Sequence, residues 1–158
     1  HKDIIDMLIT NGANVNCEDH NNQTPLHIAA DYGHKDIVEK LISNGAKVDP
    51  SDSRHKVVAE KLISNGAKVD ITDVFNHTAL HLAAKNGHRD VVEKLITKGA
   101  KVDPINSLKR TPLHMAAANG NLQIVQILVA NGASLTITDY RNQTPYQIAL
   151  SSILTPRM

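Results

Sequence analysis

The chain repeats itself at a nearly constant interval. The tripeptide Asn11-Gly12-Ala13 returns in the same or nearly the same form at positions 44–46, 65–67, 98–100 and 131–133. Successive copies therefore begin 33, 21, 33 and 33 positions apart. Self-similarity at a fixed period of about 33 residues indicates a stacked array of small structural units. The period predicts the fold class before any local propensity is considered.

One unit, residues 19–51, carries the signals of two short helices. Thr24 and Pro25 begin the first, because a Thr hydroxyl accepts a backbone N–H of the first turn and Pro gives up a donor that has no partner there. Gly33 ends it, and the second helix starts near His34 with one apolar stripe and one polar face. The stripe consists of Ile37, Val38, Leu41 and Ile42, and the outward residues are Lys35, Asp36, Glu39 and Lys40. Asp36 and Lys40 have the i, i+4 spacing of an ion pair within one helix.

Two short helices cannot bury their apolar faces alone, so the units must stack. Four short motifs recur along the chain: Thr-Pro-Leu-His, Ala-Ala, Gly-His and Gly-Ala. Together they resemble the repeat of ankyrin-repeat proteins, and the resemblance covers essentially all 158 residues. The resemblance implies an all-α solenoid of antiparallel helix pairs with turn or β-hairpin loops, as one array over 1–158. The expected units are a partial repeat at 1–18, full repeats at 19–51, 73–105 and 106–138, a truncated repeat at 52–72 and a C-terminal partial repeat at 139–158.

The truncated repeat, with its step of 21 instead of 33 positions, lacks the block that would carry its first helix. Its register survives, since residues 60–70 repeat residues 39–49. Three interpretations stay open: the block after about Ser53 is missing from this sequence, the deletion is genuine, or the site is a functional hinge. A genuine deletion would kink the array at Asp49 to Arg54 or fold the segment back over the gap. Because the chain begins inside a repeat, we also expect flanking repeats on its N-terminal side.

Composition argues against several classes of partner. A net charge of +1, from 17 basic and 16 acidic residues, leaves no basic excess for a nucleic acid or an anionic membrane. No apolar run reaches the roughly 18 residues that a membrane helix needs. The single Cys17 rules out an internal disulfide and fits a reducing compartment. We therefore expect a cytoplasmic monomer, with a secreted effector or toxin as the alternative.

The nine histidines do not predict a metal site. Seven occupy fixed places in the repeat: His27, His81 and His114 in the first-helix motif, and His1, His34, His55 and His88 at the start of the second helix. The family resemblance implies that such histidines bond to neighbouring loop backbones. No nucleophile stands beside a base, no Gly-rich phosphate loop is present, and Cys17 has no partner at metal-ligand spacing. We expect no catalysis, no metal and no cofactor in these residues.

The aromatic residues point to a binding surface. Tyr146 replaces a core Leu of the motif, whereas Tyr32, Phe75 and Tyr140 fall at positions that the repeat leaves free. The resemblance implies that these positions line the concave face that contacts partners, where exposed aromatics suit binding hot spots. The alternative is that each ring covers loop backbone. The expected partner-binding residues are His20, Asn21, Gln23, Asp31, Tyr32, Phe75, His77, Lys85, Asn86, Leu108, Arg110, Asn119, Tyr140, Arg141 and Gln143, with Tyr32, Phe75, His77, Arg110 and Tyr140 as anchors.

The function expected from these features is recognition of a protein or peptide by a rigid scaffold. The alternative is a targeting segment of a larger enzyme, toxin or secreted effector whose activity lies outside these residues. An engineered scaffold is disfavoured by the irregular units. The resemblance also implies that Asn16 matches an asparagine that can be hydroxylated in the family, although a turn-forming role is the favoured interpretation.

Overall fold

The computed structural model describes residues 2–44 and 69–154, and all statements about structure refer to these residues. They contain only helices and loops, which confirms the expected all-α repeat fold. The helices are α1 (Lys2–Thr10), α2 (Pro25–Asp31), α3 (Lys35–Asn44), α5 (Ala79–Asn86), α6 (Arg89–Thr97), α7 (Pro112–Ala118), α8 (Leu122–Ala130) and α9 (Pro145–Leu154). Most of the truncated repeat and the expected kink at Asp49–Arg54 lie outside the described residues.

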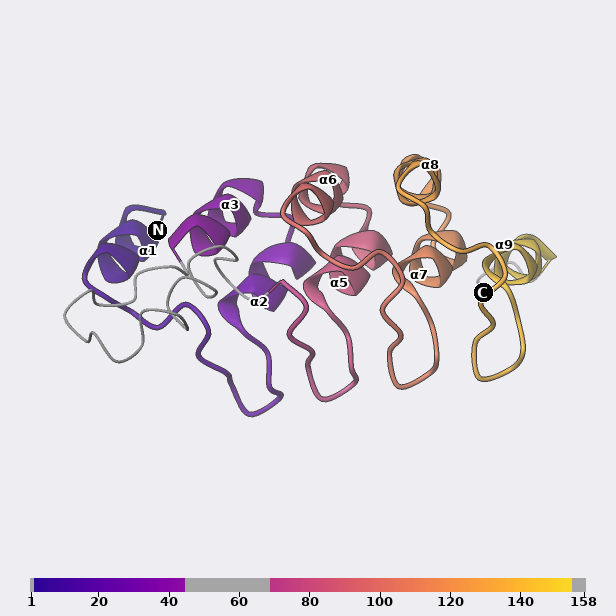
Figure 1. Cartoon of the computed structure of the whole chain (residues 1–158), viewed down its shortest axis with the longest axis horizontal. Coiled ribbons are helices and arrows are strands. Elements are labelled where there is room, and N and C mark those ends of the chain that lie inside the picture. Colours follow the sequence, from indigo (N-terminus) through magenta and orange to yellow (C-terminus); the bar gives the residue numbers. More distant parts are fainter. Residues whose placement is uncertain (1, 45–68, 155–158) are drawn as a thin grey trace.

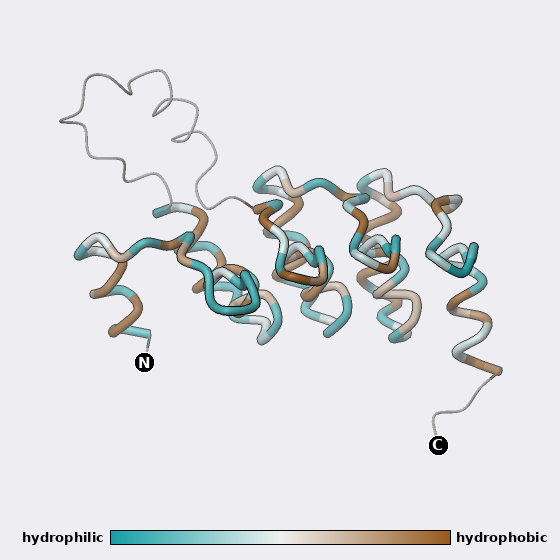
Figure 2. The backbone as a smooth tube through the Cα atoms, turned by 90° about the horizontal axis from the view of Figure 1, so that it is seen from below, coloured by the Kyte–Doolittle hydropathy of each residue, from teal (hydrophilic) through white to brown (hydrophobic). Residues whose placement is uncertain are grey.

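The helices form two rows (Figure 1). The first helices of successive units, α2, α5, α7 and α9, pack side by side, and the second helices α3, α6 and α8 pack above them. Helix α1 begins the row of second helices. Hairpin-shaped loops project from the side of the array opposite the second helices, and Figure 2 views these loops from below.

The local signals of the repeat act as expected. Pro25, Pro112 and Pro145 are the first residues of their helices. The Oγ1 atoms of Thr78 and Thr111 each accept the backbone N–H three residues later, at 3.4 Å. These caps satisfy donors that a helix start otherwise leaves unpaired.

The core lies between the two rows and between neighbouring units. It contains fully buried leucine and isoleucine side chains from both rows: Leu80 and Leu113 from first helices, and Leu95, Ile124 and Leu128 from second helices. The Ala-Ala pairs of α2, α5 and α7 are also buried, at 29–30, 83–84 and 116–117. Small residues at these places let neighbouring first helices approach closely, so the core belongs to the stack rather than to any one unit.

A histidine in each full unit ties that unit to the next. Thr78 N–H donates to Nδ1 of His81 at 3.1 Å, and Nε2–H of His81 donates to the carbonyl of Arg110 at 2.9 Å. Nδ1 is thus an acceptor and Nε2 carries the proton, which is the neutral imidazole. Burial lowers the pKa of His81 to about 4 and also lowers the pKa of His27 and His114. The expected structural role of these three histidines is confirmed.

The stack continues directly from α2–α3 to α5–α6. Helix α2 packs on α5 and α3 on α6, as α5 packs on α7 and α6 on α8. His27 reaches the carbonyl of His77, 50 residues later, whereas the matching bonds of His81 and His114 span 29 residues. The first span is longer by 21 residues (50 against 29), which is the interval between the tripeptide copies that begin at positions 44 and 65. The units on either side of the irregular spacing therefore meet through the same contacts as all the others.

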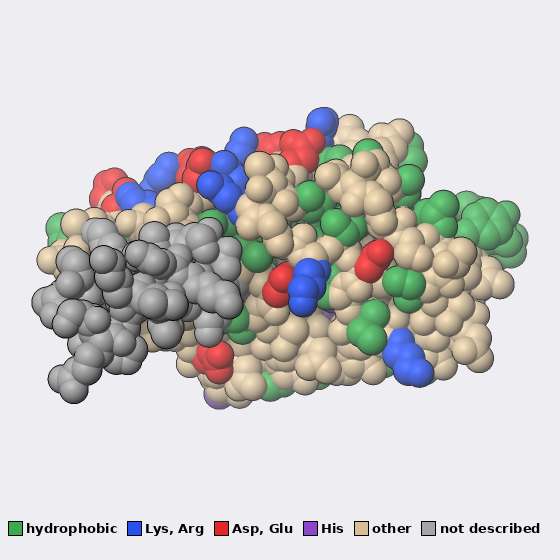
Figure 3. Space-filling model, in the orientation of Figure 1, with side chains coloured by type: hydrophobic (Ala, Val, Ile, Leu, Met, Phe, Trp, Pro, Cys, Tyr) green, Lys and Arg blue, Asp and Glu red, His purple; other side chains and the backbone are tan. Residues whose placement is uncertain are grey.

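Ion pairs join the second helices of neighbouring units. The predicted pair of Asp36 and Lys40 within one helix is wrong. Asp36 does not pair with Lys40 in its own helix: it pairs with Lys2 of α1 at 2.6 Å, and Lys40 pairs with Asp6 of α1. Lys94 of α6 continues the row to Glu39 at 2.6 Å. Charges of both signs run along the second helices, and the row does not continue over α8 (Figure 3). Arg89 and Glu93 of α6, by contrast, do pair within one helix, at 3.0 Å.

Candidate partner-binding surface: the hairpin tips

Each hairpin is built on an acidic or amide side chain at its first position. Asp73 Oδ1 accepts the backbone N–H groups of Phe75 and His77, at 2.9 and 2.8 Å. The same pair of bonds is made by Asp19, Asn106 and Asp139 in their hairpins. A backbone bond from the first residue to the carbonyl of the fifth, such as Asp73 N–H to His77 at 3.0 Å, closes each loop. The tip is thus held rigid by its own backbone and one side chain.

Successive tips are joined to one another by a ladder of backbone hydrogen bonds. Val74 N–H donates to the carbonyl of Asn21 at 3.0 Å. Ser107 N–H donates to Phe75 at 2.9 Å, and Tyr140 N–H donates to Leu108 at 3.1 Å. We call these bonds the tip ladder. Because it fixes each tip against the next, side chains on different hairpins keep constant relative positions.

The fourth residue of each hairpin within residues 2–44 and 69–154 has a left-handed backbone conformation without being glycine. Asn22, Asn76 and Asn142 have φ values of 56°, 57° and 58°, and Lys109 has 54°. Asn tolerates this region better than Lys does, because its short polar side chain bonds locally.

Lys109→Asn should therefore raise the free energy of unfolding by about 0.5 kcal/mol. Urea unfolding followed by circular dichroism measures the change, and Asn76→Lys is the reverse control, expected to lower stability by a similar amount. A loss of stability in Lys109→Asn would contradict the assignment of strain to this position.

The predicted residues at the tips are exposed and near one another. Phe75 is 61% exposed, Tyr140 48% and Leu108 45%. Val74 and Phe75 make the hairpin of residues 73–77 partly hydrophobic, whereas residues 19–23, which include His20 and Asn21, are all hydrophilic. Arg141 is exposed and lies over the Tyr140 ring, with Cζ 5.2 Å from its centroid. The tip ladder therefore presents a mixed strip, with apolar groups on three of the four hairpins in the described part of the chain.

The predicted residues at the base of the hairpins are half-buried and hold the loops in place. Nε of Arg110 lies 3.1 Å from Oδ2 of Asp139, and Nδ1 of His77 lies 3.2 Å from Oδ2 of Asp73. Burial raises the pKa of Asp139, but backbone N–H bonds from Gln143 and Arg141 and the Arg110 guanidinium outweigh it, so the net shift is downward. The carbonyl of Gln143 accepts hydrogen bonds from Asp139 N–H and from Nε2–H of His114. The carbonyls at the same position of the earlier hairpins accept the matching bonds. Gln23 completes this set: it is half-buried, and its N–H donates to Oδ1 of Asp19 at 2.9 Å.

The remaining predicted residues lie at the ends of the first helices. Tyr32 is exposed beside His34, with their rings stacked 6.4 Å apart. Nδ2 of Asn86 donates to the carbonyl and to Oδ1 of Asp31, at 3.0 and 2.8 Å, so these two residues join adjacent units. Lys85 and Asn119 are exposed at the matching ends of α5 and α7. These residues form a second row, separated from the tips by the length of a first helix.

Two sequence interpretations of single residues have different outcomes. Tyr146 does not replace a core Leu in the structure, since it is 73% exposed because no second helix covers α9 in the described part of the chain. Asn16 is half-buried, and its N–H donates to Oδ1 of Asn14 at 2.9 Å within the turn after α1. This bond agrees with a turn-forming role.

Other kinds of site have little support in the described part of the chain. Residues 2–44 and 69–154 contain no group of three or more His, Cys, Asp or Glu side chains placed to hold a metal ion. None of the helices described is both long enough and apolar enough to cross a bilayer.

The sequence predicts the exposed hairpin tips but not the tip ladder, because its backbone groups come together only when the units stack.

Comparison with known proteins agrees with this architecture. A family model of ankyrin repeats in three copies matches residues 1–52 and 51–139. No curated protein matches the chain.

Proposed function

The chain belongs to the ankyrin-repeat family, whose repeats generally mediate protein–protein interactions, and from this premise we propose that it binds a protein or peptide through its hairpin tips. The partner contacts the concave side formed by the tips and the first helices. Phe75, Leu108 and Tyr140 are its apolar anchors, and Tyr32 extends the contact at the end of α2. We further propose that these residues act without a cofactor and carry no catalytic activity.

The observation that carries the proposal is the rigid mounting of exposed apolar side chains. Phe75 and Leu108 each accept a tip-ladder bond through their carbonyls, and Tyr140 donates one through its N–H. A preorganised surface loses little conformational entropy on binding, so more of the contact energy appears as affinity. Exposed aromatic side chains near the centre of an interface supply much of its energy.

Charge on the tips supports a protein rather than a nucleic acid as partner. Arg141 is exposed on Tyr140, but the guanidinium of Arg110 is neutralised by Asp139. A phosphate backbone is bound by several unpaired Lys and Arg side chains along one stripe. The strip of aromatic, aliphatic and amide groups instead suits a surface of mixed polarity.

Replacing Phe75 or Tyr140 by Ala should weaken partner binding by more than about 1 kcal/mol each, or more than about fivefold in Kd. Both side chains are exposed, so the melting temperature should barely change. The partner is captured from the native source by affinity pulldown with mass spectrometry, and its affinity for each variant is measured by calorimetry.

The matched control is Leu122→Ala, which removes an equally exposed apolar side chain from the outer face of α8. It should leave the affinity unchanged. If the Phe75→Ala, Tyr140→Ala double variant bound the captured partner as well as the parent chain does, the assignment of the tips would be wrong.

A further inference from the structure

Two cations stand exposed on adjacent hairpin tips. Lys109 and Arg141 are both exposed, and their hairpins are joined where Tyr140 N–H donates to the carbonyl of Leu108 at 3.1 Å. No acidic side chain of residues 2–44 and 69–154 forms an ion pair with either of them. Two positive charges therefore face solvent beside apolar residues of the proposed binding surface.

The acidic side chains of the hairpins at 73–77 and 139–143 do not balance these charges, because they point into the loops. Asp73 and Asp139 are 5% and 2% exposed, and Oδ1 of each accepts two backbone N–H groups of its own hairpin. Their Oδ2 atoms lie 3.2 Å from Nδ1 of His77 and 3.1 Å from Nε of Arg110. The hairpin between them has an amide, Asn106, at the same position. The exposed side of these three tips is therefore positively charged.

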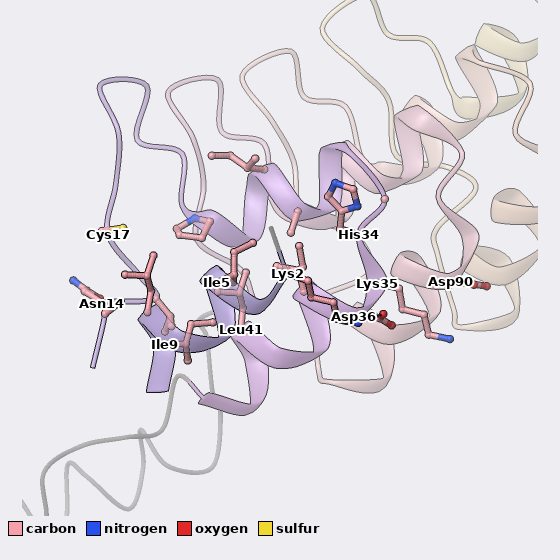
Figure 4. Close-up of a pocket in the computed structure, with 18 residues that line it drawn as sticks. Lys2, Ile5, Ile9, Asn14, Cys17, His34, Lys35, Asp36, Leu41 and Asp90 are labelled. Carbon is pink, nitrogen blue, oxygen red and sulfur yellow. Dashed lines mark hydrogen bonds and ion pairs between the residues drawn. The ribbon is translucent and has the colours of Figure 1, made fainter. Parts of the chain in front are cut away.

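Cations on the second helices have partners inside the chain. Lys2 and Asp36 form an ion pair of 2.6 Å beside the cavity of about 920 Å³ between α1 and α3, which both residues line (Figure 4). Lys40 and Lys94 likewise pair with acids of the preceding second helix. A paired charge has little net field with which to attract a partner. The tip cations differ from these because no acid neutralises them.

Lys109 also occupies a backbone position that favours a different residue. Its φ is 54°, in the left-handed region where the other three described hairpins have Asn. A long side chain there costs stability that Asn would not. Unfavourable backbone conformations persist mainly where a residue serves a function. The retention of a lysine at this place indicates that its charge is used.

The third residues of the hairpins form a row that changes from polar to apolar to cationic. In chain order they are Asn21, Phe75, Leu108 and Arg141. Phe75 and Leu108 have a hairpin on each side and are still 61% and 45% exposed, so the shape of the hairpin itself exposes this position. Arg141 occupies the same position in the next hairpin. The row places two apolar side chains beside one cation.

Building on the proposed function, we propose that the partner presents an acidic segment to this row. Its apolar side chains pack on Phe75 and Leu108, and an Asp or Glu carboxylate binds between Lys109 and Arg141. Hydrogen bonds from ammonium and guanidinium groups to a carboxylate are stronger than neutral ones. The Arg141 guanidinium already rests on the Tyr140 ring, with Cζ 5.2 Å from the centroid, so it loses less freedom on binding than an unsupported side chain does.

The spacing of the units sets the spacing of the partner's side chains. Neighbouring first helices pack about 8–10 Å apart, and three residues of an extended chain span about 10 Å. An extended partner that follows the row should therefore place its two apolar residues and its acid at every third position.

The test uses fluorescently labelled peptides in which two leucines and one glutamate stand three positions apart in a Gly-Ser background, made in both chain directions. Fluorescence anisotropy with the purified chain should show binding by a Glu peptide, and more than about fivefold weaker binding when Lys replaces the Glu. The affinity should fall as salt is added. Equal binding of the Glu and Lys peptides, or no binding of either at about 1 mM, would overturn the proposal.

Reversing the tip charges makes the test specific. The Lys109→Glu, Arg141→Glu double variant should prefer the Lys peptide to the Glu peptide, and its fold should be retained because both residues are exposed. Lys109→Asn should bind the Glu peptide more weakly than the parent chain although it is the more stable protein, which separates the effect of charge from that of stability. The matched control is Lys35→Glu, which makes the same charge change at an exposed residue of α3 and should bind like the parent chain.

Failure of this inference can be told from failure of the proposed function. If the partner captured from the native source lost affinity for Phe75→Ala but bound the double charge variant as tightly as the parent chain, the tips would be the binding surface and the acidic preference would be wrong. If neither change weakened its binding, both proposals would be wrong. A double variant that still preferred the Glu peptide, or a Lys35→Glu variant that lost as much affinity, would also contradict the carboxylate site.

Discussion

Replacing His81 by Ala should lower the free energy of unfolding by about 3 kcal/mol. The imidazole of His81 is fully buried and bonds to Thr78 N–H on one side and to the Arg110 carbonyl on the other. Alanine would leave both backbone groups without these partners and would open a cavity between two units. Urea unfolding followed by far-UV circular dichroism measures the loss.

The chain itself supplies the control for this substitution. In α9, Gln147 takes the place of the histidine and accepts Thr144 N–H through Oε1 at 2.8 Å. His81→Gln keeps one acceptor and one donor at similar positions, so it should cost about 1 kcal/mol or less. If Gln and Ala at this position were equally destabilising, the cost would come from packing alone and the bridging role would be wrong.

Acidification should destabilise the array through the same histidines. Burial lowers the pKa of His81 from 6.5 to about 4. Between these two pH values the imidazole stays neutral in the folded protein but is protonated in the unfolded chain. Because the unfolded state binds more protons between these values, stability is complete above pH 6.5 and falls as the pH drops towards 4. At about 1.36 kcal/mol per unit, His81 alone accounts for roughly 3 kcal/mol over this range. The lowered pKa values of His27 and His114 add to the loss in the same direction.

The measurement is the free energy of unfolding at a series of pH values from 7.5 to 4.5. The steepest fall should lie below pH 6.5, and His81→Gln should show a shallower fall than the parent chain. Asp139, whose pKa is lowered from 3.8, contributes a loss only at still lower pH, so it does not obscure the histidine range. Stability that stayed constant, or rose, between pH 6.5 and 4.5 would contradict the neutral, buried state of these histidines.

The features predicted correctly from the sequence are those that depend on residues close together in one unit. Thr-Pro helix starts and glycine helix ends act within a few residues, and the regular period reports that the same local structure recurs. The histidine role was also predictable, but through the family resemblance, because its acceptor lies in the next unit.

The features that were missed depend on which units are neighbours. Asp36 pairs with Lys2 rather than with Lys40, because the ion pair across units is available only after stacking. Tyr146 occupies a core position in the repeat but is exposed, since burial there requires a second helix that α9 lacks in the described structure. The tip surface was predictable as a set of positions, whereas the tip ladder that makes it rigid depends on the distance between hairpins.

The direct packing of α2–α3 on α5–α6 changes how positions along this chain should be compared. Residues that touch across the array are usually about one period apart, yet Glu39 meets Lys94 across 55 residues. A search for correlated substitutions at a fixed offset would pair Glu39 with the wrong residue and overlook its real neighbour. Since each unit meets the next through the same few positions, chain length between two units can change during evolution while those contacts persist. Positions in this protein should therefore be compared by the order of their units in the stack and not by the number of residues between them.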